Sequence, residues 1–526
     1  RYKRCRNPMI FRGPYNEITA PELSLPEFVL TRAGELADKP ALIDAGSGRV
    51  TTYGELGAAV RRAAVGLYAR GLRKGDVLAL FSPNLPEYAV AFHAVATLGG
   101  VVTPANPTYT SAELAHQLKD AGAKYLLTIP PLLDKALEAA RGTNVQEIFV
   151  FGEAEDATPF HSLMENDGVL PEIKLDPRED LVALPYSSGT TGVAKGVMLT
   201  HYNMVANLCQ LRDHDMTDER DTLIAILPFF HIYGMNVLLN YGLHKGAAIV
   251  VMPRFEMEPF LRAMQTYGVT RAHLVPPVIL ALAKQTVVDE YDLSKLEMIM
   301  SGAAPLSESL TAACCERLKC VIKQGYGMTE ASPVTHMCCE DPAGIKYGSI
   351  GQCVPSTECK VVDLETGAEL GPDAEGELWV RGPQMMKGYL NRPEATAQTL
   401  DADGWLHTGD IGYADAEGHF YIVDRAKELI KYKGFQVAPA ELEAMLLTHP
   451  AVADAAVIPS PDEEAGEVPK AFVVLKGEAT ERELKEYVAA RVAPHKKIRK
   501  LEFIEQIPKS PSGKILRRVL VQRERK

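Results

Sequence analysis

The sequence lacks any apolar run long enough to span a lipid bilayer, which excludes a bilayer-spanning helix. It also lacks a secretory signal, because the basic stretch Arg1 to Arg6 is not followed by an apolar segment. Met9 has the character of a natural start, so we expect residues 1–8 to lie upstream of it. The end of the chain, Glu524 to Lys526, does not match a peroxisomal address.

The nine cysteines lack the spacing of a metal site, since none forms a C-x-x-C pair. Two pairs are vicinal, Cys314/Cys315 and Cys338/Cys339. This arrangement suits neither a disulfide framework nor a zinc site. The sequence therefore predicts a protein of a reducing compartment, the cytoplasm.

Internal repeats and low-complexity tracts are also missing, and the composition is that of a globular enzyme, with 46% hydrophobic and 24% charged residues. A chain of 526 residues exceeds one hydrophobic core, so two or more domains are expected. The net charge is −12, yet residues 491–526 hold twelve Lys and Arg against three Glu. This basic end is compatible with nucleic acid, with a polyanionic small ligand or with a solvated surface.

Strand-like and helix-like segments alternate through the first 300 residues, a rhythm that predicts parallel sheets covered by helices. Thr52 with Glu55, and Thr110 with Glu113, form capping boxes that mark helix starts. After about residue 355 the pattern changes to short strands and glycine turns. Beyond Asp424 it becomes a mixed unit of about one hundred residues. The expected elements are strands at 41–44, 77–81, 101–102, 125–129, 455–458 and 471–475, and helices at 86–98, 440–447 and 481–491.

The expected fold is therefore α/β. A large N-terminal domain at 9–424 combines mixed and parallel sheets with flanking helices and a small β-rich subdomain. A small mobile α+β domain follows at 425–526.

A loop of small residues, Tyr186-Ser-Ser-Gly-Thr-Thr-Gly-Val-Ala-Lys195-Gly196, lies between two apolar runs. Backbone amides, hydroxyls and the Lys195 charge aimed at one point suit a polyphosphate. The loop is not a Walker A motif, which runs Gly-x-x-x-x-Gly-Lys-Ser/Thr into a helix. An ordinary Gly/Ser/Thr hairpin is an equally good interpretation of this stretch alone.

Four further stretches carry chemistry, and each also has a plain structural interpretation. His231 lies among aromatics in Pro228-Phe-Phe-His-Ile-Tyr-Gly234, where a lone histidine is more often a core residue. Gln324-Gly-Tyr-Gly-Met-Thr-Glu330 suits an aromatic ring, a phosphate and Mg²⁺, or a simple turn. Asp410 suits ribose hydroxyls, although Gly-Asp is also common in turns. Lys514 lies on the loop Pro508–Lys514, where a solvated surface charge is the default.

Taken together, in this order, these stretches closely resemble the adenylate-forming superfamily from about residue 20 to residue 520. Pro228–Gly234, Ser301-Gly-Ala-Ala-Pro305 and Lys427-Glu-Leu-Ile-Lys-Tyr-Lys-Gly-Phe-Gln-Val-Ala-Pro-Ala-Glu441 look most like 4-coumarate–CoA ligases. The resemblance implies an ATP-dependent ligase that converts an aromatic acid of the hydroxycinnamate type into acyl-AMP and then into a CoA thioester. ATP, Mg²⁺ and coenzyme A would be its small-molecule partners, with no nucleic acid and with a monomer or homodimer as the assembly.

The resemblance also assigns residues. His231, Lys431 and Lys514 would be catalytic, Glu330 would bind the metal, and Lys433 and Gly434 would bind CoA. Lys427 would lie at an interdomain hinge near 424–427. The residues for ATP and AMP would be Ser187, Ser188, Gly189, Thr190, Thr191, Lys195, Ala303, Gln324, Gly325, Tyr326, Thr329, Asp410, Arg425, Lys427 and Gln436.

The acid would lie among Ile232, Tyr233, Val237, Ala303, Gly325, Gly327, Pro333 and Val334. Several of these are small, which suits a flat ring, and Tyr233 would offer an aromatic face and one hydroxyl. One methyl group changes selectivity by only about 1–3 kcal/mol, so medium- and long-chain fatty acids stay open.

Three other functions remain as alternatives. A stand-alone adenylation enzyme that loads a carrier protein is the most serious, although no carrier domain is evident. A luciferase-type oxygenase ranks low, because the His231-Ile-Tyr233 pattern differs from the luciferases. An inactive nucleotide-binding regulator is expected to have lost Glu330 or Lys514, and both are present.

Overall fold

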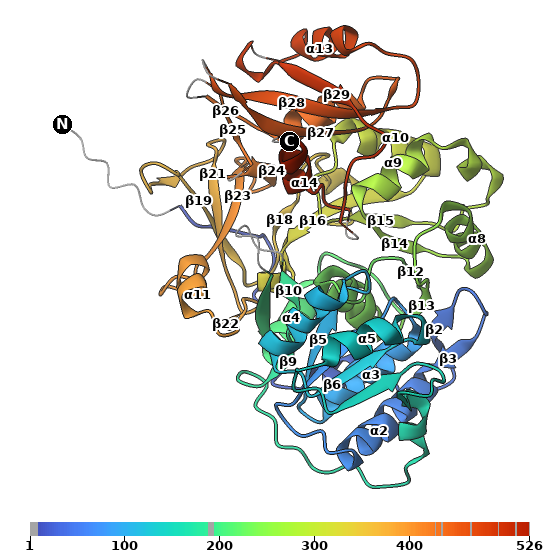
Figure 1. The fold of residues 1–526 in the computed structure, drawn as a ribbon. Coiled ribbons are helices and arrows are strands. Elements are labelled where there is room, and N and C mark those ends of the chain that lie inside the picture. Colours follow the sequence, from blue (N-terminus) through green and yellow to red (C-terminus); the bar gives the residue numbers. More distant parts are fainter. Residues whose placement is uncertain are drawn as a thin grey trace.

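The computed structural model describes residues 9–187, 194–426, 428–432, 435–462, 465–492, 494–510 and 513–524. Within these residues the strands form four sheets, three in a large N-terminal domain and one in a small C-terminal domain. Figure 1 shows the small domain above the other three sheets. The predicted α/β class, with a large and a small domain, is confirmed.

The first sheet has the order β10-β11-β9-β5-β4-β6-β7-β8, with β22 paired to β11. Its strands β5, β4, β6 and β7 are parallel, and β11 is antiparallel to β9 and β10. The strands are β4 (Val77–Phe81), β5 (Val101–Ala105), β6 (Tyr125–Thr128), β7 (Glu147–Val150), β8 (Thr158–Pro159), β9 (Leu181–Ala183), β10 (Tyr186–Ser187), β11 (Lys195–Thr200) and β22 (Gly388–Tyr389).

Helices cover this sheet, three of them where the sequence predicts a helix, whereas the fourth, at Leu133–Ala140, was not predicted. They are α2 (Tyr53–Ala69), α3 (Pro86–Thr97), α4 (Ser111–Ala121) and α5 (Leu133–Ala140). The capping boxes of Thr52 with Glu55 and of Thr110 with Glu113 are both formed. Each box satisfies amide groups of the first helical turn that have no partner within the helix.

The second sheet has the order β18-β17-β16-β15-β14-β12-β13-β2-β3. Strands β2, β13, β12, β14, β15 and β16 are parallel, so their carboxyl ends share one edge, where α/β sheets bind ligands. The strands are β2 (Pro40–Asp44), β3 (Val50–Thr52), β12 (Thr222–Ala225), β13 (Ala248–Val251), β14 (Arg271–Leu274), β15 (Met298–Ser301), β16 (Val321–Gly327), β17 (Val334–Met337) and β18 (Gln352–Cys353).

The elements packed with the second sheet are mostly helices. They are α1 (Leu25–Val29), α6 (His201–Gln210), a π-helix (Tyr233–Asn240), α7 (Tyr241–Lys245), α8 (Met257–Tyr267), α9 (Pro276–Lys284) and α10 (Glu308–Leu318). A 3₁₀ turn (Thr329–Ala331) follows β16.

The third sheet is antiparallel and forms the β-rich part that the glycine turns predict. It contains β1 (Phe11–Arg12), β19 (Glu358–Val362), β20 (Glu369–Leu370), β21 (Gly376–Arg381), β23 (Leu406–Ala414) and β24 (Phe420–Arg425), and α11 (Pro393–Thr399) precedes β23. Asp410 lies inside β23, so the turn interpretation of this aspartate is wrong. The strand continues because its main chain pairs with β24 on one side and β21 on the other.

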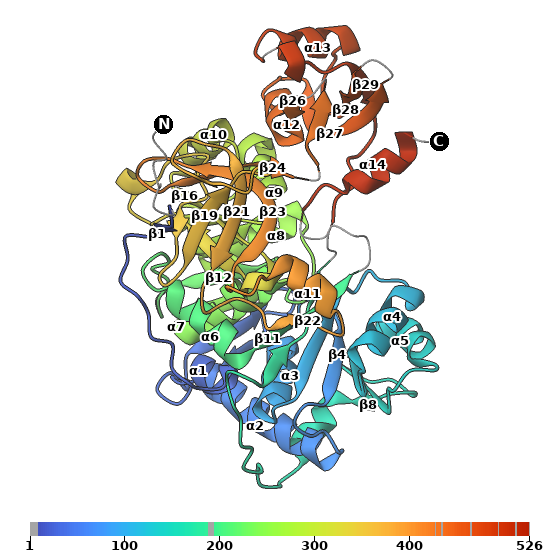
Figure 2. The ribbon, with the colours of Figure 1, turned by 90° about the vertical axis from the view of Figure 1, so that its left-hand side faces the viewer.

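The small domain has its own apolar core, which includes Ile430, Leu442, Val457 and Val473. Its elements are β25 (Ile430–Tyr432), β26 (Phe435–Val437), α12 (Pro439–Leu447), β27 (Val452–Asp462), β28 (Gly466–Leu475), α13 (Glu481–Ala489), β29 (Lys500–Phe503) and α14 (Arg517–Glu524). Figure 2 shows the small domain from the side, above the sheets of the large domain.

Strands β27 and β28 extend well beyond the predicted strands at 455–458 and 471–475. Prolines at 459, 461 and 469 interrupt the apolar pattern, and proline normally argues against a central strand. The main chain nevertheless stays paired in register through Pro459 and Pro469. Tertiary pairing therefore decided the strand lengths.

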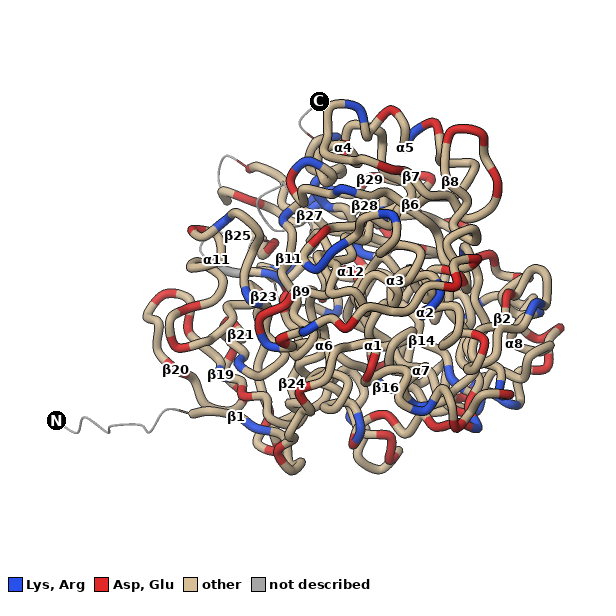
Figure 3. Tube along the Cα trace, turned by 90° about the horizontal axis from the view of Figure 1, so that it is seen from below, with Lys and Arg blue, Asp and Glu red and all other residues tan. Residues whose placement is uncertain are grey.

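Several basic residues of the C-terminal segment are paired with acids of the small domain itself. Lys496 pairs with Glu441 at 2.7 Å, Lys509 with Asp454 at 2.6 Å, and Arg523 with Glu502 at 2.7 Å. In Figure 3, basic and acidic residues are interspersed along the chain. The excess of positive charge seen in the sequence is thus partly neutralised within the fold. Within the described residues, no helix has both the length and the apolar character needed to cross a bilayer.

Candidate active site

Ser187, Lys195, Glu330 and Tyr389 meet where the first and second sheets adjoin. Ser187 and Lys195 are register partners on β10 and β11. One oxygen of Glu330, Oε1, accepts hydrogen bonds from the Ser187 hydroxyl at 2.9 Å and from the Tyr389 hydroxyl at 2.8 Å. The Lys195 ammonium lies 4.9 Å from the centroid of the Tyr389 ring.

Tyr389 is a site residue that sequence reasoning missed. It orients both the predicted metal carboxylate and the predicted phosphate lysine. It lies on β22, about sixty residues after Glu330, and its local sequence carries no recognisable motif. The pairing of β22 with β11 brings it to the site.

The carboxyl ends of β15 and β16 hold the segment predicted to flank adenine. The side chain of Gln324 accepts from the Leu306 amide at 2.9 Å and donates to the Leu306 carbonyl at 3.1 Å. These two hydrogen bonds fix residues 302–306 against β16. Ala303 has φ of 70°, a left-handed conformation that is costly for alanine and is found mainly where structure around it enforces it.

Asp410 and Arg425 are direct cross-strand partners on β23 and β24. The Arg425 Nε lies 3.1 Å from Asp410 Oδ1, and the Tyr326 hydroxyl donates to Oδ2 at 2.5 Å. Burial raises the pKa of Asp410, while the Arg425 charge and the Tyr326 bond oppose that rise. Three predicted nucleotide residues therefore form one hydrogen-bonded group.

His231 precedes the π-helix and is partly buried. Its Nδ1 accepts a hydrogen bond from the Tyr233 amide at 3.3 Å, which leaves Nε2 to carry the proton. Burial, reinforced by the charge of Lys514, lowers the pKa of His231 to about 3. The imidazole is therefore neutral at physiological pH and acts as a hydrogen-bond donor.

Lys514 reaches this site from the small domain. The residue is exposed overall, but the preceding Gly513 lies against the large domain, where an added Cβ would meet Val275 Cγ2 at 3.2 Å, so the ammonium group is partly desolvated. This desolvation, with the Arg425 charge, lowers the pKa of Lys514, and Asp410 and Glu330 act in the opposite direction. Lys514 is exposed, as its default interpretation has it, yet the groups that act on its charge are predicted nucleotide and metal residues.

Lys431 does not share this environment. It lies exposed on β25, and its amide donates to Glu467 of the small domain at 2.8 Å. Gln436 lies on β26 opposite Lys431, and its side chain is not described. The predicted residues Ser188, Gly189, Thr190, Thr191, Lys427, Lys433 and Gly434 lie outside the described residues. Thr329 begins the 3₁₀ turn after β16.

The residues predicted to hold the acid cluster around the ends of β15 and β16. Gly302 and Gly327 permit close packing: a Cβ on Gly302 would meet the Tyr233 ring at 2.8 Å, and one on Gly327 would meet the Pro333 carbonyl at 2.1 Å. A Cβ on Gly325 would meet Met300 Cε at 2.4 Å. The buried members of the set are Ile232, Tyr233, Val237, Pro333 and Val334.

The Tyr233 hydroxyl differs from expectation. It donates to the Met300 carbonyl at 3.1 Å, so its proton already has a partner within the protein. The ring of Tyr233 packs edge-on against His273, 5.8 Å between centroids. Tyr233 can therefore offer a ligand its ring face and an acceptor lone pair, while the hydroxyl proton stays engaged.

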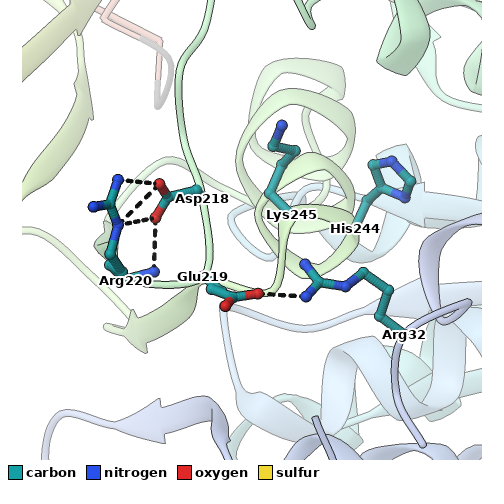
Figure 4. A pocket seen from close by; sticks show the side chains of 6 residues that line it. All are labelled: Arg32, Asp218, Glu219, Arg220, His244 and Lys245. Carbon is teal, nitrogen blue, oxygen red and sulfur yellow. Dashed lines mark hydrogen bonds and ion pairs between the residues drawn. The ribbon is translucent and has the colours of Figure 1, made fainter. Parts of the chain in front are cut away.

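A surface hollow of about 340 Å³ lies apart from these residues (Figure 4). Its lining is Arg32, Asp218, Glu219, Arg220, His244 and Lys245. Two of the cations pair with its two acids, Arg32 with Glu219 and Arg220 with Asp218. Lys245 is a third cation of the lining, so the hollow carries one more positive than negative side chain.

Comparison with known proteins gives matches along nearly the whole chain. The family model "AMP-binding enzyme" matches residues 30–390, and "AMP-binding enzyme C-terminal domain" matches 441–514. The chain is 46% identical to 4-coumarate–CoA ligase 2 of Petroselinum crispum, covering 98% of this chain and 97% of that protein. It is also 46% identical to 4-coumarate–CoA ligase 5 of Oryza sativa subsp. japonica, covering 97% and 96%.

Solved structures agree with this. The anthranilate CoA ligase AuaEII in complex with anthranoyl-AMP has a TM-score of 0.89 at 27% identity, covering 96% of this chain and 98% of that chain. ATP-bound MatB from Rhodopseudomonas palustris has a TM-score of 0.86 at 28% identity, covering 95% and 99%. The chain belongs to the AMP-binding enzyme family.

Proposed function

We propose that the chain is an AMP-forming acid–thiol ligase that joins an aromatic acid of the hydroxycinnamate type, such as 4-coumarate, to coenzyme A. The observation that carries this is the hydrogen-bonded group of Asp410, Arg425 and Tyr326 at the nucleotide side of the site, on which the charge of Lys514 from the small domain also acts. The acid class rests on the 46% identity to 4-coumarate–CoA ligases over nearly the full length.

In the first half-reaction a carboxylate oxygen attacks the α-phosphorus of ATP. The bond from that phosphorus to the bridging oxygen breaks, and pyrophosphate leaves with the electron pair. Two anions must approach each other, so fixed positive charge lowers the barrier. Lys514 and Lys195 supply that charge. Neutral His231 donates from Nε2 to the acid and orients it without adding charge.

The nucleotide is held by groups that the fold keeps in place. Asp410 accepts the ribose hydroxyls, supported by Arg425 and Tyr326. Gln324, Gly325 and Ala303 border the adenine, and Thr329 binds the α-phosphate. Ser187, Ser188, Gly189, Thr190, Thr191 and Lys195 hold the β- and γ-phosphates, with Lys427 and Gln436 as further nucleotide contacts.

Glu330 fits a magnesium ion, because an oriented carboxylate oxygen is the ligand type that Mg²⁺ prefers. Among the described residues, no group of three His, Cys, Asp or Glu forms a metal cluster. A single carboxylate suits Mg²⁺, which is usually held by one or two carboxylates together with substrate phosphates. When bound, the ion would neutralise phosphate charge.

In the second half-reaction the CoA thiolate attacks the acyl carbonyl, and AMP leaves with the electrons of its mixed-anhydride oxygen. We assign this step to Lys431, Lys433 and Gly434. The small domain would turn about Lys427, which places the domain boundary at 424–427, with domains at 9–424 and 425–526. We further propose a monomer or homodimer in a reducing cytoplasm, where the free cysteines stay reduced.

The acid lies against Ile232, Tyr233, Val237, Ala303, Gly325, Gly327, Pro333 and Val334. Main-chain carbonyls and small residues at the ends of β15 and β16 suit a flat ring better than a long flexible chain. The engaged Tyr233 hydroxyl leaves an acceptor lone pair for a phenolic donor.

A panel of acids tests the proposal by CoA-dependent AMP release and thioester formation. We expect 4-coumarate and related cinnamates to react best with free CoA. Preferred turnover of fatty acids would overturn the acid class. Thioester formation with a carrier protein and not with free CoA would overturn the acceptor.

A further inference from the structure

Helix α9 lies beside the small domain (Figure 1). Both the first and the last turn of this helix contact residues of that domain. At its start, Gly513 lies so close that an added Cβ would meet Val275 Cγ2 at 3.2 Å and Pro277 Cδ at 3.6 Å. At its last residue, the Lys284 ammonium donates to the Leu447 carbonyl at 3.2 Å. The first contact is one residue from Lys514, so α9 helps to place that lysine.

The bond at the far end links two helix termini. Leu447 is the last residue of α12, where carbonyl groups have no partner within the helix. The carboxyl end of a helix carries partial negative charge, and a lysine there is stabilising. Lys284 of the large domain therefore supplies a C-terminal cap to a helix of the small domain.

A second lysine opposes this bond. Lys476 follows β28 in the small domain, and its charge acts on Lys284. Burial, with the like charge of Lys476, lowers the pKa of Lys284. Attraction to the helix end and repulsion from Lys476 thus act on the same ammonium group, which keeps the contact weak enough to break.

We propose that Lys284 is a positioning residue that holds the small domain in the orientation in which Gly513, next to Lys514, lies against the start of α9. The proposal rests on the proposed function, in which the small domain turns between the two half-reactions. Leu447 moves with the small domain and Lys284 does not, so the bond exists in the adenylate-forming orientation alone. Lys284 therefore favours the first half-reaction over the second.

Separate half-reactions test this. Lys284→Met keeps the side-chain length and removes the donor, and we expect acyl-AMP formation to fall about two- to fivefold, the loss of one net hydrogen bond. Thioester formation from supplied acyl-AMP and CoA should stay equal or rise. Lys284→Arg should restore acyl-AMP formation, because it keeps a charged donor.

Lys476→Glu should act in the opposite direction, since it replaces the repulsion by attraction. Acyl-AMP formation is expected to hold or rise, and thioester formation to slow about two- to fivefold. Lys485→Glu is the matched control, because Lys485 bonds to Glu481 of its own helix α13. That control should change neither half-reaction.

Hydrogen exchange gives a readout that does not depend on activity. Lys284→Met should speed amide exchange in residues 276–284 and 444–449, with an unchanged melting temperature. A wild type without ligase activity would refute the proposed function, yet this exchange difference would still support the contact. Equal loss of both half-reactions, or unchanged exchange at α9 and α12, would overturn the role of Lys284.

Discussion

The hydroxyl of Tyr326 donates a 2.5 Å hydrogen bond to Oδ2 of Asp410 and so joins the end of β16 to the middle of β23. The bond links the parallel sheet, which borders the adenine, to the antiparallel sheet, which carries the ribose carboxylate. Arg425 holds the other oxygen of the same carboxylate at 3.1 Å. The geometry of the nucleotide site thus depends on contact between two sheets.

The first prediction concerns this bond. Tyr326→Phe keeps the ring and removes one donor, so Asp410 is less firmly oriented for the ribose. We expect KM for ATP to rise about fivefold to tenfold with kcat little changed, which corresponds to about 1–1.4 kcal/mol, the net contribution of one hydrogen bond. Steady-state kinetics with varied ATP measure both. Tyr413→Phe, on the same strand as Asp410, is the control, and a fall in kcat alone would refute the assignment.

The second prediction concerns His231. Because the pKa of His231 is lowered to about 3, the imidazole stays neutral from about pH 4 upwards and contributes no acid limb near neutrality. His231→Ala should lower acyl-AMP formation by about 10²–10³, the usual loss for one preorganised donor. The melting curve should be unchanged. Near-normal turnover of the variant would mean that His231 is a packing residue.

Much of the architecture followed from local sequence. The two capping boxes and the strand–helix rhythm of the first 300 residues predict elements that the structure contains, because side-chain hydrogen bonds and apolar periodicity act over a few residues. The extent of β27 and β28 did not follow, since main-chain pairing continues through prolines that argue against a strand. The strand position of Asp410 likewise depends on its neighbours β21 and β24.

The site also combines features that local sequence predicts with features that depend on tertiary contacts. Ser187, Lys195 and Glu330 lie in motifs that the sequence reveals. Tyr389 lies in no motif, and the engagement of the Tyr233 hydroxyl by the Met300 carbonyl is a tertiary contact. Both depend on residues more than fifty positions apart, which no local pattern encodes.

The third prediction tests Tyr389. Tyr389→Phe removes the hydroxyl that orients Glu330 but keeps the ring beneath Lys195. We expect the Mg²⁺ concentration for half-maximal adenylation to rise about tenfold to a hundredfold. Tyr389→Leu removes the ring as well and should also raise KM for ATP. Titration of Mg²⁺ at fixed ATP measures the Mg²⁺ requirement of both variants. If that requirement is unchanged in both, Tyr389 does not belong to the site.

The fourth prediction concerns stability of the small domain. Arg517 binds Glu428 at 2.6 Å and Glu443 at 2.8 Å, and its charge also acts on buried Asp424. Arg517→Met would leave these carboxylates without their cation, a loss of about 3–5 kcal/mol for a buried pair. Denaturant unfolding should show this loss as a lower free energy of unfolding. Arg518→Met, at the exposed neighbouring position, should change the free energy of unfolding by less than about 0.5 kcal/mol.

The last prediction separates the two steps of the reaction by their lysines. Lys514 acts electrostatically on His231 and is affected by Asp410, whereas Lys431 lies exposed on β25. Lys514→Ala should therefore reduce acyl-AMP formation by about 10²–10³ and still convert supplied acyl-AMP and CoA to thioester. Lys431→Ala should do the reverse. Loss of the same half-reaction in both variants would refute a turning small domain.

The pH dependence gives this prediction a second, independent check. A lowered pKa means that Lys514 loses its charge at a lower pH than a free lysine, so acyl-AMP formation should decline as pH rises through that value, below 10.5. Lys514→Arg keeps its charge throughout this range, because the guanidinium stays protonated. The alkaline limb should therefore move to higher pH in Lys514→Arg, even if its maximal rate is lower. A limb at the same pH in both proteins would assign it to another group and leave Lys514 without a charge-dependent role.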